Sequence, residues 1–163
     1  IEISNIIDDM INELNFDTFL LSIGVGLCAT MVMTIIEIPA WRKFGLRGVL
    51  EWHENQVLST KFFRLSESDL HTKGIFLLHF ANGGLGGFGY LLILIVFPFA
   101  ASNLILSGAA YGVFLWIITL IPIHKPITGI TPWKHPNGYI PMFTSLIGHL
   151  SYGIIMGMIF LIF

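Results

Sequence analysis

Four long apolar stretches dominate this sequence and restrict its fold more than any other feature. They cover residues 19–38, 74–97, 103–121 and 141–163, and none of them contains lysine or arginine. A helix needs about 20 predominantly apolar residues to cross the hydrocarbon core of a membrane. The strands of a membrane barrel are shorter and alternate between apolar and polar residues. We therefore expect an all-α, polytopic membrane protein built as a four-helix bundle.

The connections between these stretches set the expected topology. A proline follows each of the first three stretches, at Pro39, Pro98 and Pro122. Because proline lacks a backbone N–H, it is a common helix stop signal, and the first three spans are expected to end there. The tight connection at residues 98–102 predicts an antiparallel hairpin of the second and third spans. The long loops, at residues 39–73 and 122–140, then share one side of the membrane.

The charged residues are distributed unequally between the two sides. All eight lysines and arginines lie in the two long loops: Arg42, Lys43, Arg47, Lys61, Arg64, Lys73, Lys125 and Lys134. The positive-inside rule places these loops in the cytoplasm and both termini outside, in a multi-pass protein of the cell membrane. Only 11% of the residues are charged, against about 25% in soluble domains, so the lipid bilayer is the first expected partner. The mixed charge of the loops does not favour nucleic acid.

Two segments outside the spans have helical patterns. Residues 1–17 carry isoleucine, methionine and leucine at helical spacing between acidic residues, which predicts an extracytoplasmic amphipathic helix. Its acidic face suits anionic lipid poorly and favours contact with protein over the membrane surface. Residues 18–163 form the membrane domain. Within its first loop, Val49, Leu50, Trp52 and Val57 predict a short amphipathic helix.

Each span carries small residues at helical spacing, which allow neighbouring backbones to approach closely. The helix-packing candidates are Gly26, Gly83, Gly87, Gly108, Gly112, Gly153 and Gly157. They predict one compact bundle, although the same residues suit a homo-oligomer or a larger complex. The second and fourth spans also share the pattern His-xxx-Gly-xxx-Gly. This pattern suggests two copies of a helix–loop–helix unit in parallel orientation, with chance similarity as the alternative.

Five polar residues lie within or at the cytoplasmic ends of the spans. They are Glu37, His79, Asn82, His124 and His149, and we expect them to converge on a cavity open to the cytoplasm. Ionisable residues inside a membrane are costly and therefore mark candidate functional sites. The string from Trp52 to Asn55 contains histidine and glutamate, but we interpret it as part of a solvated loop.

This polar cluster is compatible with several functions. It suits a pathway for protons, quinones or solutes, an accessory subunit of a larger membrane complex, or hydrogen bonds that simply join helices. His79 and His149 are candidate metal or haem ligands, because imidazole is a common ligand in helix bundles. The sequence has no phosphate-binding loop or nucleophile elbow, and the glycines of residues 83–89 follow no strand. We therefore favour a non-enzymatic protein, structural or an accessory subunit.

Short motifs in the last third of the chain add a resemblance. Gly129-Ile130-Thr131-Pro132 in the second loop precedes Gly148-His149-Leu150 in the last span, and the first span carries Gly26, Ala29-Thr30 and Glu37-x-Pro39. In these segments the chain resembles the YagU-type family of small multi-span inner-membrane proteins, although its first loop departs from that family. The resemblance implies a multi-pass inner-membrane protein of unestablished activity, loosely linked to acid tolerance, and implies no catalytic residues. The small, isoleucine-rich chain also looks like accessory subunits of membrane monooxygenases, such as archaeal ammonia monooxygenase.

Overall fold

The computed structural model describes residues 16–64, 66 and 72–162, and this part of the chain is helical without strands. The helices are α2 (Phe16–Phe44), α3 (Leu50–Phe63), α4 (Thr72–Val96), α5 (Leu104–Thr119), α6 (Lys125–Thr128) and α7 (Ile140–Phe160). The turns η1 (Leu46–Gly48), η2 (Pro98–Asn103), η3 (Leu120–His124) and η4 (Pro132–Lys134) connect them. The amphipathic helix predicted for residues 1–17 lies almost entirely outside the described residues.

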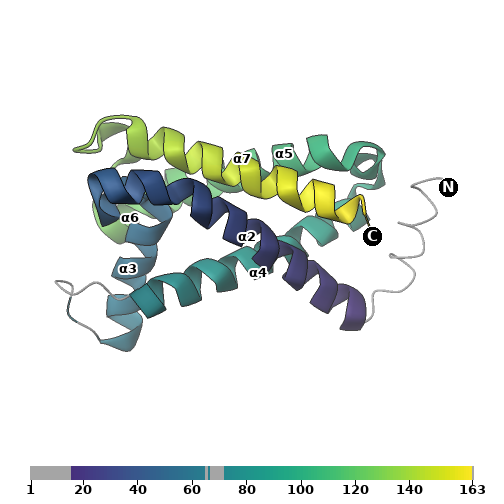
Figure 1. Cartoon of the computed structure of the whole chain (residues 1–163), viewed down its shortest axis with the longest axis horizontal. Helices are drawn as coiled ribbons and strands as arrows, with labels where there is room; N and C mark the ends of the chain where they lie inside the picture. Colours follow the sequence, from purple (N-terminus) through teal and green to yellow (C-terminus); the bar gives the residue numbers. More distant parts are fainter. Residues whose placement is uncertain (1–15, 65, 67–71, 163) are drawn as a thin grey trace.

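Four segments are long and apolar enough to cross a membrane by length and composition. They are Phe16–Phe44, Thr72–Val96, Pro98–Thr128 and Ile140–Phe160, and they confirm the prediction of four long apolar helices. The described lysines and arginines lie at the end of the bundle that carries α3 and α6 (Figure 1). The start of α2 and the end of α7 lie at the opposite end.

The first span does not end at its proline as expected. Helix α2 continues through Pro39 to Phe44, although proline removes one backbone hydrogen bond from a helix. The turn after Pro39 packs against the start of α3, where Ala40 and Trp41 join a cluster with Trp52. This burial outweighs the local preference of proline to stop the helix.

The third span also continues past its proline, by way of a wider turn. Helix α5 ends at Thr119, and a single π-turn at Leu120–His124 leads into α6. Pro122 has no N–H to donate, so the regular hydrogen-bond ladder is interrupted there. A π-turn adds one residue to the helix and often occurs at functional sites. Here it ends on His124, whose side chain is fully buried.

Glycines bring α2 and α4 into direct backbone contact. A Cβ atom on Gly26 would collide with the carbonyl oxygen of Gly83 and lie 2.9 Å from the Cα of Gly87. A Cβ atom on Gly83 would collide with the Thr30 side chain. Only small residues permit this approach, which therefore depends on the predicted glycine stripe.

Helices α5 and α7 form a second close pair in the same way. A Cβ atom on Gly108 would collide with the carbonyl oxygen of Gly153 and lie 3.2 Å from the backbone nitrogen of Gly157. A Cβ atom on Gly112 would collide with the carbonyl oxygen of His149. In both pairs, the Gly-xxx-Gly of the histidine-bearing helix meets a glycine of its partner. This correspondence agrees with the suggested repeat, which stays a prediction.

Helices α4 and α5 are antiparallel neighbours in the chain, but they do not pack together as the hairpin prediction required. Helix α2 packs closely on both α4 and α7, whereas α4 and α5 have no comparable backbone contact in the described structure. Tyrosine side chains bridge this seam instead. Tyr111 of α5 donates a hydrogen bond to the carbonyl oxygen of Gly86 (2.9 Å), and Tyr90 of α4 donates one to the carbonyl oxygen of Leu104 (2.8 Å). The hairpin prediction is wrong in its packing because bulky tyrosines separate the two helices.

Helix α3 confirms that the first loop contains a short helix, but its buried residues include Glu54, Asn55 and Gln56, so it is not the amphipathic helix that was predicted. The chain reverses direction at Gly48, where a Cβ atom would lie 2.8 Å from the carbonyl oxygen of Ala40. Val49, Trp52 and Ile75 are buried together behind this turn. Helix α3 therefore closes the end of the bundle that carries the basic residues, and part of its polar face is turned towards the long helices.

Candidate functional site

A polar cavity lies between the long helices and α3. Its volume is about 130 Å³, which suits a few water molecules or a small polar group. Its lining consists of Thr30, Met33, Glu51, Glu54, Asn55, His79, Asn82, Gly83, Leu115, Thr119, His149 and Tyr152. Among these residues Asn82 of α4 is the exposed one, and Leu115 and Thr119 of α5 face it across the seam. The cavity therefore exists because α4 and α5 do not pack together.

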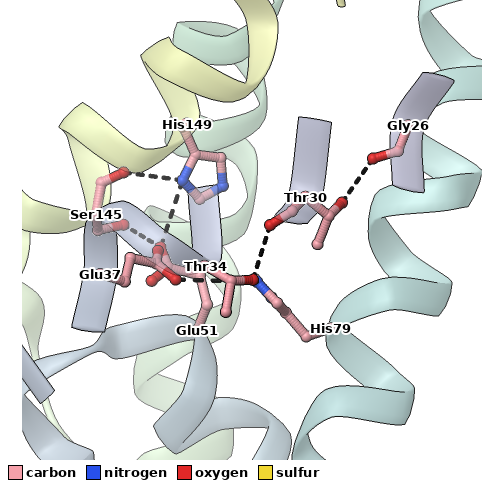
Figure 2. Close-up of polar contacts among 8 residues, drawn as sticks. All are labelled: Gly26, Thr30, Thr34, Glu37, Glu51, His79, Ser145 and His149. Carbon is pink, nitrogen blue, oxygen red and sulfur yellow. Dashed lines mark hydrogen bonds and ion pairs between the residues drawn. The ribbon is translucent and has the colours of Figure 1, made fainter. Parts of the chain in front are cut away.

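On one side of the cavity, His79 is held by α2 (Figure 2). Its Nε2 lies 3.1 Å from Oγ1 of Thr34, which itself donates to the carbonyl oxygen of Thr30 at 2.7 Å. Because the Thr34 proton is used in that bond, Thr34 accepts and His79 Nε2 donates. In the neutral ring, Nδ1 is then the proton acceptor.

Glu37 lies behind His79 and is fully buried. Its Oε2 is 3.9 Å from His79 Nε2, and neither carboxyl oxygen has a hydrogen-bond partner among the described residues. Glu51 and the Trp52 indole act on this carboxyl electrostatically. A buried carboxyl without a full set of partners is costly and unusual in a structural role. Glu37 thus adjoins the cavity through His79 and Glu51, which both line it.

On the other side of the cavity, His149 is held by its own helix and by α3. Its Nδ1 lies 3.0 Å from the carbonyl oxygen of Ser145 and 3.4 Å from Glu51 Oε1. Ser145 also donates a short hydrogen bond to Glu51 (Figure 2). A carbonyl oxygen only accepts, so Nδ1 carries a proton and Nε2 is the acceptor of the neutral ring. Each cavity histidine therefore has one N–H held by the protein, which is Nε2–H in His79 and Nδ1–H in His149.

A third carboxyl–imidazole pair joins α3 to the π-turn. His124 Nδ1 lies 2.6 Å from Glu54 Oε1, and both side chains are buried. Burial, and to a smaller extent the Glu51 carboxylate, raise the pKa of Glu54 from 4.5 to about 9. Near neutral pH Glu54 is consequently protonated, and this contact is a hydrogen bond between neutral groups.

The cavity brings together most of the residues that the sequence singled out. His79, Asn82 and His149 line it, and Glu37 adjoins it behind His79. His124 does not line it, and reaches it only through Glu54. Three of the five residues therefore meet at one cavity, and His124 and Glu37 lie one contact further away, while the opening to the cytoplasm stays a prediction.

Helix α3 contributes residues to the site that were not predicted from the sequence. Trp52, Glu54 and Asn55 are buried, so the interpretation of this string as part of a solvated loop is wrong. Glu51, Glu54 and Asn55 lie at helical spacing on one face, and this polar stripe is the signal that could have been used. It was misread because a polar face normally points to water, whereas here it faces other polar groups.

The described part of the chain gives no support to a metal or haem site at His79 and His149. Within the described residues, no group of three or more histidine, cysteine, aspartate or glutamate side chains is arranged to hold a metal ion. His79 and His149 each use one ring nitrogen in hydrogen bonds within the protein. The metal hypothesis gains no support from this geometry.

The arrangement is suited to proton exchange. Three imidazoles each contact a carboxyl group, and two of these pairs lie on opposite walls of one cavity. Histidine and carboxyl groups with shifted pKa values are the usual proton donors and acceptors of proteins. Comparisons with protein-family models, curated proteins and solved structures give no match. The functional argument therefore rests on this geometry.

Proposed function

We propose that this chain is a multi-pass protein of the cell membrane that exchanges protons through its polar cavity, as part of a pathway for protons or a small polar solute. The observation that carries this proposal is the set of three carboxyl–imidazole pairs at and beside the cavity. Buried ionisable groups are rare in membrane helices unless they serve a pathway or a binding site. A purely structural role would be fulfilled by hydroxyl and amide groups at lower cost.

The orientation belongs to the same proposal. The end of the bundle with the described lysines and arginines faces the cytoplasm, and the two termini face outside. Beyond the cavity the interior is packed with apolar and aromatic side chains, including Tyr90, Met156 and Phe160. In the proposal this packing closes the conformation towards the outside, which suits a transporter-like protein that opens alternately better than an open channel.

Labelling of single cysteines tests the orientation. In a Cys28→Ser background, Asn137→Cys marks the loop between η4 and α7, and Ser102→Cys marks the connection between α4 and α5. A membrane-impermeant maleimide applied to intact cells should label position 102 and leave position 137 unlabelled until the membrane is opened. The reverse pattern would overturn the orientation.

Reconstitution tests the proton pathway. Purified protein is inserted into liposomes that contain a pH-sensitive dye, and a potassium gradient with valinomycin supplies the driving force. We expect proton uptake above that of protein-free liposomes, with His149→Asn lowering the rate by about tenfold or more. The matched control is Tyr139→Phe, a change at an exposed side chain that belongs to none of the three pairs. Equal rates with and without protein would reject the proposal.

An accessory-subunit role, for example in a membrane monooxygenase, is a second candidate. Its supporting observation is a largely apolar pocket of about 610 Å³ at the outer part of the α4–α5 seam, lined by Phe97, Phe99, Tyr111 and Phe114 among others. A helix of a partner protein would fill it. The predicted helix-packing glycines are used within the chain, so they do not support a homo-oligomer. Purification in mild detergent should recover other membrane chains, and recovery of the 18.2 kDa chain alone would contradict this role.

A further inference from the structure

A second polar cavity lies on the other side of α3. Its volume is about 360 Å³, and Arg47, His53, Gln56 and Asn137 are among its lining residues. It lies at the end of the bundle that carries η1, α3 and η4, where the basic residues gather. Helix α3 thus separates this cavity, which we call the vestibule, from the cavity between the long helices.

Two consecutive residues of α3 face the two cavities. His53 lines the vestibule, and Glu54 lines the cavity of the proposed function. Consecutive side chains of a helix point about 100° apart, so one helix can present a group to each side. The backbone of α3 blocks any direct passage, and side chains must bridge it.

His124 provides that bridge. Its Nδ1 is hydrogen-bonded to Glu54 Oε1 at 2.6 Å, and its ring centroid lies 6.1 Å from that of His53. Nε2 of His124 and Nδ1 of His53 are buried, and neither has a hydrogen-bond partner among the described residues. Buried polar atoms are seldom left without partners, and a water molecule bound between the two rings would satisfy both.

From this geometry we infer that His53, His124 and Glu54 form a proton relay past α3, from the vestibule to the cavity between the long helices. The relay rests on the proposed function, for which it supplies the cytoplasmic entry. The groups that face it from other elements are Arg47 of η1 and His135 beside η4, with Glu51 next to Glu54 on α3 itself.

The proton balance of one transfer is simple. After Glu54 gives its proton to an acceptor in the cavity, its carboxylate takes the Nδ1 proton of His124. Nε2 of the same ring takes a proton from the bridging water, so the ring stays neutral and Glu54 is protonated again. A proton from the vestibule, passed by way of His53, restores the water. A histidine whose two nitrogens face different partners is suited to this exchange.

The protonation states agree with this direction of transfer. Glu54, with a pKa of about 9, holds its proton at neutral pH until an acceptor in the cavity removes it. Burial and the neighbouring His124, Arg47 and His135 lower the pKa of His53 to about 4, so His53 passes a proton on without retaining it.

Hydrogen–deuterium exchange of the Glu54 acid tests the relay without any assumption about transport. The infrared band of this acid is identified as the carbonyl stretch that Glu54→Gln removes from the spectrum at neutral pH. After transfer of the protein in liposomes to D₂O, His124→Asn should slow the shift of this band by about tenfold or more. His53→Asn, at a less buried position, should slow it as well, and Tyr139→Phe should leave the wild-type rate.

The outcomes separate the relay from the proposed function. Slower exchange in both histidine variants supports the relay, even if wild-type liposomes show no proton uptake. The absence of proton uptake would then reject the proposed function but not the relay. Wild-type exchange in a correctly folded His53→Asn or His124→Asn variant overturns the relay, whatever the uptake assay gives. Circular dichroism and the elution volume in detergent establish that the variants are folded.

Discussion

His124 Nδ1 lies 2.6 Å from Glu54 Oε1, although 70 residues separate them in the chain. This contact joins the third apolar segment to α3, a helix that sequence patterns place in a loop. It depends on two local features, the π-turn that ends at His124 and the reversal of the chain at Gly48. The site thus extends from the long helices into the first loop.

Glu54 should make the stability of the protein depend on pH. Its pKa is about 9 in the folded protein against 4.5 for an ordinary glutamate, so the folded state binds this proton more tightly. The contribution of protonated Glu54 to the free energy of unfolding is fully present below pH 4.5. It is lost as the pH rises to about 9, at up to about 1.4 kcal/mol per pH unit. Thermal unfolding in detergent should therefore show a smaller decline over this range in Glu54→Gln. Identical pH profiles of the two proteins would contradict the buried, protonated state of Glu54.

His53 should act with the opposite sign and in a lower pH range. Its pKa is about 4 in the folded protein against an ordinary 6.5, so the unfolded state binds the proton more tightly between these values. Stability should rise as the pH increases from 4 to 6.5. In His53→Asn this rise should be reduced, as measured by the same unfolding experiment. A variant that loses the same stability on acidification as wild type would show that His53 is not the group responsible.

The contact between α5 and α7 should not tolerate a single methyl group. Gly108→Ala places a Cβ atom against the carbonyl oxygen of Gly153, and overpacking of this kind costs about 1–3 kcal/mol. Gly24→Ala is the matched control, because a Cβ atom there meets open space and alanine is the better helix former. Unfolding in mixed detergent should separate the two variants. Equal stability would refute the close packing of this pair.

Tyr152 should stabilise the seam between α4 and the rest of the bundle. Tyr152→Phe removes the hydrogen bond to the carbonyl oxygen of Gly83 and should cost about 0.5–1.5 kcal/mol. The control is Tyr139→Phe, whose side chain is 61% exposed. The same unfolding measurement applies, and a loss in the control equal to that in Tyr152→Phe would argue against the bridging role.

Some features of the site could be predicted from local sequence, and others could not. His79 and His149 were identified because each is an ionisable residue within an apolar stretch, which is a property of the stretch itself. Glu54 and Asn55 were misread because their surroundings are set by residues far away in the chain. The prediction that the first and third spans end at Pro39 and Pro122 is wrong for a related reason. Burial of the turns that follow these prolines outweighs the local effect of proline.

The sequence by itself determined the four apolar helices, the one-sided distribution of basic residues and the glycine stripes, because each of these follows from composition and spacing within one segment. The tertiary structure decided which stripes meet, so that α2 pairs with α4 and α5 pairs with α7. It also decided that the tyrosines keep α4 and α5 apart, which leaves the cavity, and that α3 supplies Glu51 and Glu54 to it. These features depend on the shapes of side chains from distant segments, and no single segment contains that information.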